Sequence, residues 1–149
     1  MTNMDAELLD IKKDFFRMRN GVVADSLKKL YPSGKVIFGL NVPQLAQLAK
    51  IYPRSLSLGM KLWEDKGCRE SRLLSLYIIP PSELDKETAL KMIRDVESRE
   101  EAEFLPFRLL RNLSYAKDLV DALTASEIKG EMPLYCLEML KKNLALIES

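Results

Sequence analysis

Five cationic side chains have a spacing suited to binding phosphate groups. They are Arg69, Arg72, Arg108, Arg111 and Lys117. The arginines form two pairs, each three residues apart, so each pair would share one face of a helix. Stacked helix pairs could align all five as a stripe along a nucleic-acid backbone. The alternative is a solvated or ion-paired surface, with Glu70 and Glu103 as the neighbouring counter-charges.

The other residue types restrict the possible chemistry. The sequence contains no histidine, which is the commonest general base near neutral pH and the commonest metal ligand. Cys68 and Cys136 form no CxxC pair, so both are predicted to be free thiols, and no histidine is present to activate Cys68 as a nucleophile. There is also no glycine-rich phosphate loop. We therefore predict neither a metal nor a cofactor.

Length and composition indicate a globular protein. The 149 residues suit one domain, 1–149, and 47% hydrophobic with 30% charged residues is an ordinary balance. A net charge of +1 supplies no overall basic field, so DNA binding would require a local cationic face. No apolar run is long enough to span a membrane, and Met1–Asp10 lacks the basic-then-apolar order of a secretory signal. We expect a cytoplasmic protein with no membrane contact.

Apolar residues recur at helical spacing along the whole chain, which predicts an all-α fold. About nine helices are expected, at 4–19, 22–30, 41–52, 55–65, 69–79, 82–96, 99–112, 114–123 and from 126 onward. In the last segment Pro133 is expected to mark the start of the main helix. Residues 35–40 are the one stretch with some strand character, but no similar segment could pair with them, and we expect a loop.

Local signals set the ends of these helices. Asn41 is a good N-cap, and Ser98 with Glu101 has the spacing of a capping box. Pro80-Pro81 prevents a helix from continuing, and Pro106 should kink the helix that contains it. Short helices joined by short turns are typical of antiparallel helix pairs stacked into an α-α superhelix of the HEAT/ARM kind.

Two segments resemble the AlkD-like DNA alkylation repair family of HEAT-like proteins. The first is Phe38-Gly39-Leu40-Asn41-Val42-Pro43-Gln44-Leu45-Ala46-Gln47-Leu48-Ala49-Lys50, and the second is Leu62-Trp63 followed by Glu70-Ser71-Arg72-Leu73-Leu74. They occur in the order and spacing of the family, and weaker similarity extends over residues 5–144. The resemblance implies a concave cationic surface that holds duplex DNA, and in active members it implies the release of alkylated bases without a metal or cofactor.

The resemblance also implies roles for single residues. The family's Trp-x-x-x-Asp pair aligns with Arg99 and Glu103, which makes Glu103 the candidate catalytic carboxylate but leaves no aromatic ring beside it. Trp63 is the only tryptophan, and its apolar helix favours packing in the core over stacking on a base. Glu70 beside Arg72 is interpreted as a buried ion pair that locks adjacent helices.

Two hypotheses for function follow. In the first, the chain is a DNA-binding member of the alkylation repair family that contacts duplex DNA phosphates, with weak or absent base release assisted by Glu103. In the second, it is a catalytically inactive helical-repeat module that binds a protein partner, as the missing tryptophan and the near-neutral charge suggest.

Overall fold

A computed structural model of the chain describes residues 3–148, and within them every regular element is helical. The all-α prediction is therefore confirmed. The described part contains nine α-helices, with 3-10 turns after α2, before α6 and after α7. The chain divides into two compact units, one ending at Pro80 and one beginning at Pro81. The predicted superhelix is an arrangement of the whole chain, and it stays a prediction.

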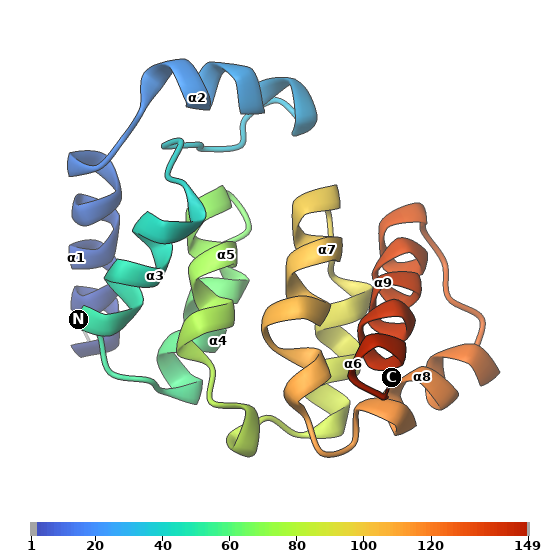
Figure 1. The fold of residues 1–149 in the computed structure, drawn as a ribbon. Coiled ribbons are helices and arrows are strands. Elements are labelled where there is room, and N and C mark those ends of the chain that lie inside the picture. Colours follow the sequence, from blue (N-terminus) through green and yellow to red (C-terminus); the bar gives the residue numbers. More distant parts are fainter. Residues whose placement is uncertain (1–2, 149) are drawn as a thin grey trace. The chain divides into compact units, whose positions relative to one another are not determined.

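The N-terminal unit, up to Pro80, contains five helices (Figure 1). Their bounds are α1 Asn3–Arg17, α2 Gly21–Leu27, α3 Val42–Ile51, α4 Leu56–Glu64 and α5 Arg69–Ile78. α5 packs against both α3 and α4, and α4 also contacts α1. This position buries almost every residue of α5, including polar ones. Figure 1 shows α2 running crosswise to α1.

The C-terminal unit, from Pro81, contains four helices. They are α6 Lys86–Arg94, α7 Arg99–Arg108, α8 Ala116–Ala125 and α9 Glu131–Glu148. α7 lies beside α9, which also packs on α8 and α6. The core of this unit is built from Leu105, Leu119, Leu137 and Leu140, all buried.

Several predicted helix ends are confirmed by their hydrogen bonds. Asn41 caps α3 by accepting the Gln44 N–H at 2.9 Å, and the Gln44 side chain accepts the Asn41 N–H in return. Ser98 caps α7 by accepting the Glu101 N–H at 3.1 Å. The Glu101 carboxylate accepts the N–H of Glu97, one residue before the position that a capping box uses.

Other predicted boundaries are wrong. α6 begins at Lys86, because Asp85, not Ser82, is its N-cap, and residues 81–83 form a 3-10 turn. α7 ends at Arg108, two residues after Pro106, and a 3-10 turn follows over Leu110–Asn112. α9 begins at Glu131 and not at 126, because Gly130 precedes it with a φ of +102° that does not belong to a right-handed helix. Pro133 lies in the first turn of α9, close to the start predicted for the main part of this helix.

The segment 35–40 is a loop, as predicted. Val36 forms an isolated parallel bridge with Cys68, donating its N–H to the Gly67 carbonyl at 2.7 Å and accepting the Arg69 N–H at 3.0 Å. These two bonds attach the loop to the turn before α5. No described helix is long and apolar enough to cross a membrane.

Candidate phosphate-binding groove

Two of the five predicted cations, Arg69 and Arg72, are inside the N-terminal unit. Arg69 is 5% exposed and Arg72 is fully buried. The Arg69 Nη1 atom lies 2.6 Å from the Glu70 carboxylate and 3.1 Å from the Leu40 carbonyl oxygen. The Arg72 guanidinium stacks 3.9 Å from the centre of the Trp63 ring. Because neither arginine reaches the surface in this structure, they are not part of a candidate phosphate site.

Glu70 is buried in an ion pair, as the sequence indicated, but the cation that lies 2.6 Å away is Arg69, whereas the prediction named Arg72. The Glu70 carboxylate is fully buried. It also accepts the backbone N–H groups of Phe38 and Gly39, each at 3.0 Å, and that of Leu40 at 3.4 Å. A buried carboxylate is tolerated when a cation and several donors surround it. Glu70 therefore joins α5 to the loop before α3.

Trp63 is 2% exposed on α4, so its predicted role in packing is confirmed. Its ring nitrogen is buried and has no hydrogen-bond partner. The cation that covers its face is Arg72 of α5. In this structure no base or sugar has access to the ring.

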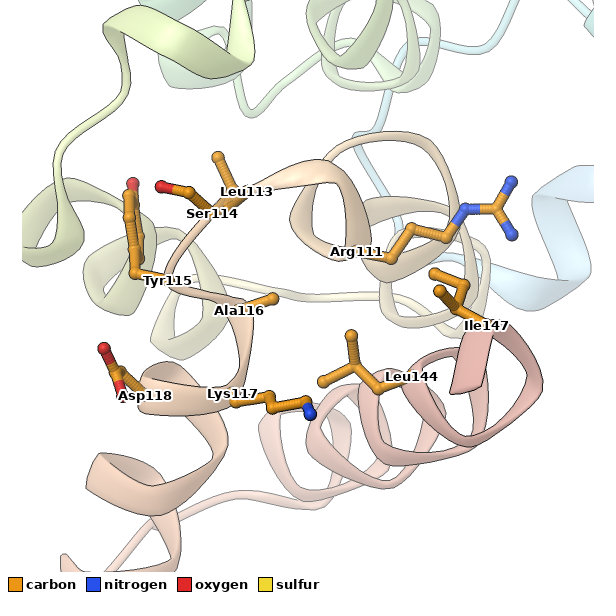
Figure 2. A pocket seen from close by; sticks show the side chains of 9 residues that line it. All are labelled: Arg111, Leu113, Ser114, Tyr115, Ala116, Lys117, Asp118, Leu144 and Ile147. Carbon is orange, nitrogen blue, oxygen red and sulfur yellow. The ribbon is translucent and has the colours of Figure 1, made fainter. Parts of the chain in front are cut away.

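The other predicted cations are in the C-terminal unit, and two of them share a hollow of about 470 Å³ between α8 and α9 (Figure 2). Residues 113–118 form one wall, and Arg111, Leu144 and Ile147 complete the lining. Lys117 is exposed and Arg111 is partly exposed, so both can reach a ligand in solution. Arg108, partly buried at the end of α7, is not among the lining residues.

The side chains of this hollow are arranged around an apolar centre. Figure 2 shows the Lys117 ammonium extending toward Leu144, and the Arg111 guanidinium extending past Ile147. The Arg111 guanidinium also lies 4.2 Å from the centre of the Phe107 ring, which limits its freedom. The Asp118 carboxylate points away from the Lys117 ammonium. The two cations therefore both border this hollow, and Asp118 is the carboxylate among its lining residues.

A second hollow, of about 400 Å³, continues the first one along the same two helices. It shares Lys117 and Leu144 with the first, and Lys141 of α9 and Asp121 of α8 are among its other lining residues. The two hollows together are called the α8–α9 groove. Lys141 pairs with Glu138 at 3.3 Å, one turn earlier on α9. Lys141 was missed in the sequence because its position depends on which face α9 presents to α8.

The α8–α9 groove suits anionic oxygen atoms at its border and apolar groups at its centre. Ser114 contributes a hydroxyl, and Tyr115, the N-cap of α8, makes no side-chain cap hydrogen bond. The Tyr115 hydroxyl instead donates to the Leu84 carbonyl, and burial raises its pKa, so it stays neutral. The N–H groups at the start of α8 add a partial positive charge beside Lys117.

Glu103, the candidate catalytic carboxylate, lies on a different surface of the same unit. It is on α7, its side chain is 46% exposed, and it does not line the α8–α9 groove. Arg99 Nε donates to its Oε1 atom at 2.9 Å, and the Tyr135 hydroxyl of α9 donates to the same oxygen at 2.8 Å. These two hydrogen bonds, the first being the stronger cause, lower the pKa of Glu103. The carboxylate is thus ionised and in water.

An aromatic ring does lie beside Glu103, although the sequence alignment placed none there. The Tyr135 ring centre is 5.2 Å from the Arg99 guanidinium, so Arg99, Glu103 and Tyr135 form one cluster across α7 and α9. The sequence could not reveal this neighbour, because Tyr135 is 32 residues from Glu103. Among the described residues, no group of three or more potential metal-ligating side chains lies together.

No protein-family model, curated protein or solved structure matches this chain.

Proposed function

We propose that this chain binds the phosphate backbone of duplex DNA through the α8–α9 groove, without reading sequence. The observation that carries the proposal is that Arg111 and Lys117, two of the five predicted cations, line one hollow. The resemblance to the AlkD-like family motivates the choice of duplex DNA over other polyanions. Two buried, free thiols are consistent with the cytoplasmic location that we propose with it.

The expected affinity is modest. The C-terminal unit has 10 Lys and Arg against 14 Asp and Glu, which gives it a net charge of −4. The groove cations must therefore act locally, against a repulsive background. Binding that uses a few phosphate contacts belongs to the non-specific class, with a dissociation constant of roughly 10⁻⁴ to 10⁻⁶ M at physiological salt.

Base release is not expected to follow binding. An ionised carboxylate stabilises a developing positive charge best in a closed, water-poor site. Glu103 is nearly half exposed and shares its oxygen with Arg99 and Tyr135. Incubation of the full chain with alkylated duplex DNA should release no free base above the buffer control. Release that depends on Glu103 would contradict this part of the proposal.

Fluorescence anisotropy of a labelled duplex tests the binding itself. Removing both groove charges, as Arg111→Gln with Lys117→Gln, should weaken binding and make the slope of log K against log salt shallower by about 2. The matched control is Lys91→Gln with Arg94→Gln on α6, because both residues are exposed and neither lines the groove. Equal effects of the two double variants would contradict the assignment of the groove.

A module that binds protein partners is the second candidate, and exposed apolar residues favour it. Phe16, Val22 and Leu30 of the N-terminal unit are 55%, 79% and 69% exposed. Large side chains exposed to this degree can contribute apolar area to a protein interface. If the anisotropy shows no binding at low salt, or binding that salt does not weaken, this candidate replaces DNA binding.

A further inference from the structure

The N-terminal unit is the cationic half of this chain. Up to Pro80 the sequence has 13 Lys and Arg against 8 Asp and Glu, a net charge of +5, although the whole chain has +1. Arg69 and Arg72 are buried within it, so the other cations provide the field at its surface. Three of these, Lys28, Lys29 and Lys35, lie within eight residues. A concentration of like charge in a short segment favours an anionic ligand.

Lys28 and Lys35 line the same hollow, which has a volume of about 510 Å³. Residues 31–35 form most of its lining, and Ile37 also contributes to it. Pro32, Ser33 and Gly34 make a turn in which the Lys35 N–H donates to the Pro32 carbonyl at 3.4 Å. Gly34 has a φ of +92°, and the space beside its Cα is open. The turn thus presents its backbone and the Ser33 hydroxyl without a bulky side chain at Gly34.

The wall of this hollow is fixed from behind. Ala24, Tyr31 and Ile37 form a small buried cluster beneath it, with Leu27 packed against them. After Lys35, the Val36 backbone forms hydrogen bonds with the backbones of Gly67 and Arg69. The Glu70 carboxylate then accepts the N–H groups of Phe38 and Gly39. A binding site on so well-anchored a loop loses little entropy when it takes up a ligand.

The two ammonium groups of Lys28 and Lys35 have different partners. Lys35 Nζ donates to the Lys66 carbonyl at 2.5 Å and lies 5.7 Å from the centre of the Tyr31 ring. Lys28 Nζ is 3.6 Å from the exposed Asp25 carboxylate, an i,i+3 pair in water that contributes little energy. An incoming dianion competes well with such a pair, because it offers more charge and three or four acceptor oxygens.

We propose that the hollow lined by Lys28, Ser33 and Lys35 binds a phosphate group. The two ammonium groups supply the charge, and the Ser33 hydroxyl with the backbone N–H groups of Ser33 and Gly34 supplies directional donors. The proposal goes beyond DNA binding, because a ligand with a single phosphate group is enough to occupy this hollow. Free phosphate, a nucleotide and a nucleic-acid backbone share this chemistry and are separated by experiment.

NMR titration of the full chain with inorganic phosphate tests the proposal. The expected result is saturable amide shift changes concentrated in residues 28–37, with an affinity that falls tenfold or more in Lys28→Gln with Lys35→Gln. The matched control is Lys13→Gln with Lys50→Gln, which removes two exposed lysines of the same unit outside the hollow. Shift changes that are spread over the unit, or equal losses in the two variants, would overturn the proposal.

Two further titrations identify the source of the phosphate and separate this site from the α8–α9 groove. Adenosine monophosphate binding tighter than inorganic phosphate, again lost in the Lys28/Lys35 variant, indicates a nucleotide ligand. A duplex oligonucleotide that shifts residues 28–37 and competes with inorganic phosphate indicates a nucleic-acid backbone. If duplex DNA does not bind while inorganic phosphate does, the groove proposal fails and this one stands. If the duplex shifts only the resonances of the groove residues and inorganic phosphate does not bind, the phosphate proposal fails and the groove proposal stands.

Discussion

The Glu70 carboxylate accepts the backbone N–H of Gly39 at 3.0 Å, across 31 residues of sequence. The same carboxylate accepts from the neighbours of Gly39 on both sides and pairs with Arg69. A single buried side chain thus organises the loop that leads into α3 and supports one wall of the proposed phosphate hollow.

Replacing this carboxylate should be among the most damaging single changes. Glu70→Gln keeps the shape but leaves Arg69 buried without its counter-charge, which typically costs about 3–5 kcal/mol. That is a large part of the roughly 5–15 kcal/mol that stabilises an ordinary domain. Urea denaturation followed by circular dichroism measures the loss. The control is Glu64→Gln, on the exposed face of α4, for which a change within about 0.5 kcal/mol is expected.

Gly39 and Gly34 allow the free-energy cost of a side chain at positive φ to be compared at a crowded and an open position. Gly39 has a φ of +87°, and a Cβ there would lie 2.4 Å from the Asn20 carbonyl oxygen and 2.9 Å from the Ala24 nitrogen. Gly34 has a similar φ of +92° with open space around it. We expect Gly34→Ala to cost about 1–2 kcal/mol through the backbone alone, and Gly39→Ala at least about twice that through the added clash. Similar urea midpoints for the two variants would show that the backbone around Gly39 relaxes.

The fluorescence of Trp63 should show that its ring is buried and should not change when a ligand binds. As the only tryptophan, and 2% exposed, it should give blue-shifted fluorescence that acrylamide quenches poorly. Duplex DNA should leave this emission unchanged, because the ring is covered by Arg72 and inaccessible to a base. Strong quenching by DNA would contradict the packing role.

Substitution of Trp63 measures how much its packing contributes to the free energy of unfolding. Trp63→Ala leaves a large cavity and removes the surface on which the Arg72 guanidinium stacks, so a loss of about 3–5 kcal/mol is expected. Trp63→Phe should cost clearly less, because it keeps a ring and removes a buried N–H that has no acceptor. Circular dichroism in urea is the measurement, since both variants lack the fluorescent side chain.

The sequence predicted the helices well, because apolar spacing and cap residues act locally. Asn41 and Ser98 cap the helices that their sequences indicated. Boundaries were missed where two local signals compete, as at residues 126–130, where Ser126 offers a cap but Gly130 adopts a positive φ just before α9. A serine alone does not show whether the chain continues as a helix or turns first.

The candidate site was predicted less well, because burial depends on what surrounds a helix. Arg69 and Arg72 have the spacing of a surface pair, as do Arg108 and Arg111, but α5 is covered by both α3 and α4. The neighbours Lys141 and Tyr135 needed the packing of α9 to be known.

Glu103 gives a prediction for the dependence of stability on pH. Arg99 and Tyr135 lower the pKa of its carboxyl below the ordinary value of 4.5, so folding is favoured by the ionised form. This contribution is fully present above the pKa of the unfolded chain and is lost as the pH falls through the lower pKa of the folded chain. Because the group is nearly half exposed, solvent screens it and the contribution is small.

Comparison of Glu103→Gln with the unchanged chain measures this contribution directly. At pH 7 the variant should unfold at a slightly lower urea concentration, and the difference should disappear at acid pH once the carboxyl is protonated in both states of the unchanged chain. Affinity for duplex DNA should not fall, because Glu103 lies outside the α8–α9 groove. A stability difference between the two chains that grows as the pH falls would mean that the pKa of the Glu103 carboxyl is raised. A raised pKa is the property of a general acid in a closed site. That result would support Glu103 as a catalytic residue.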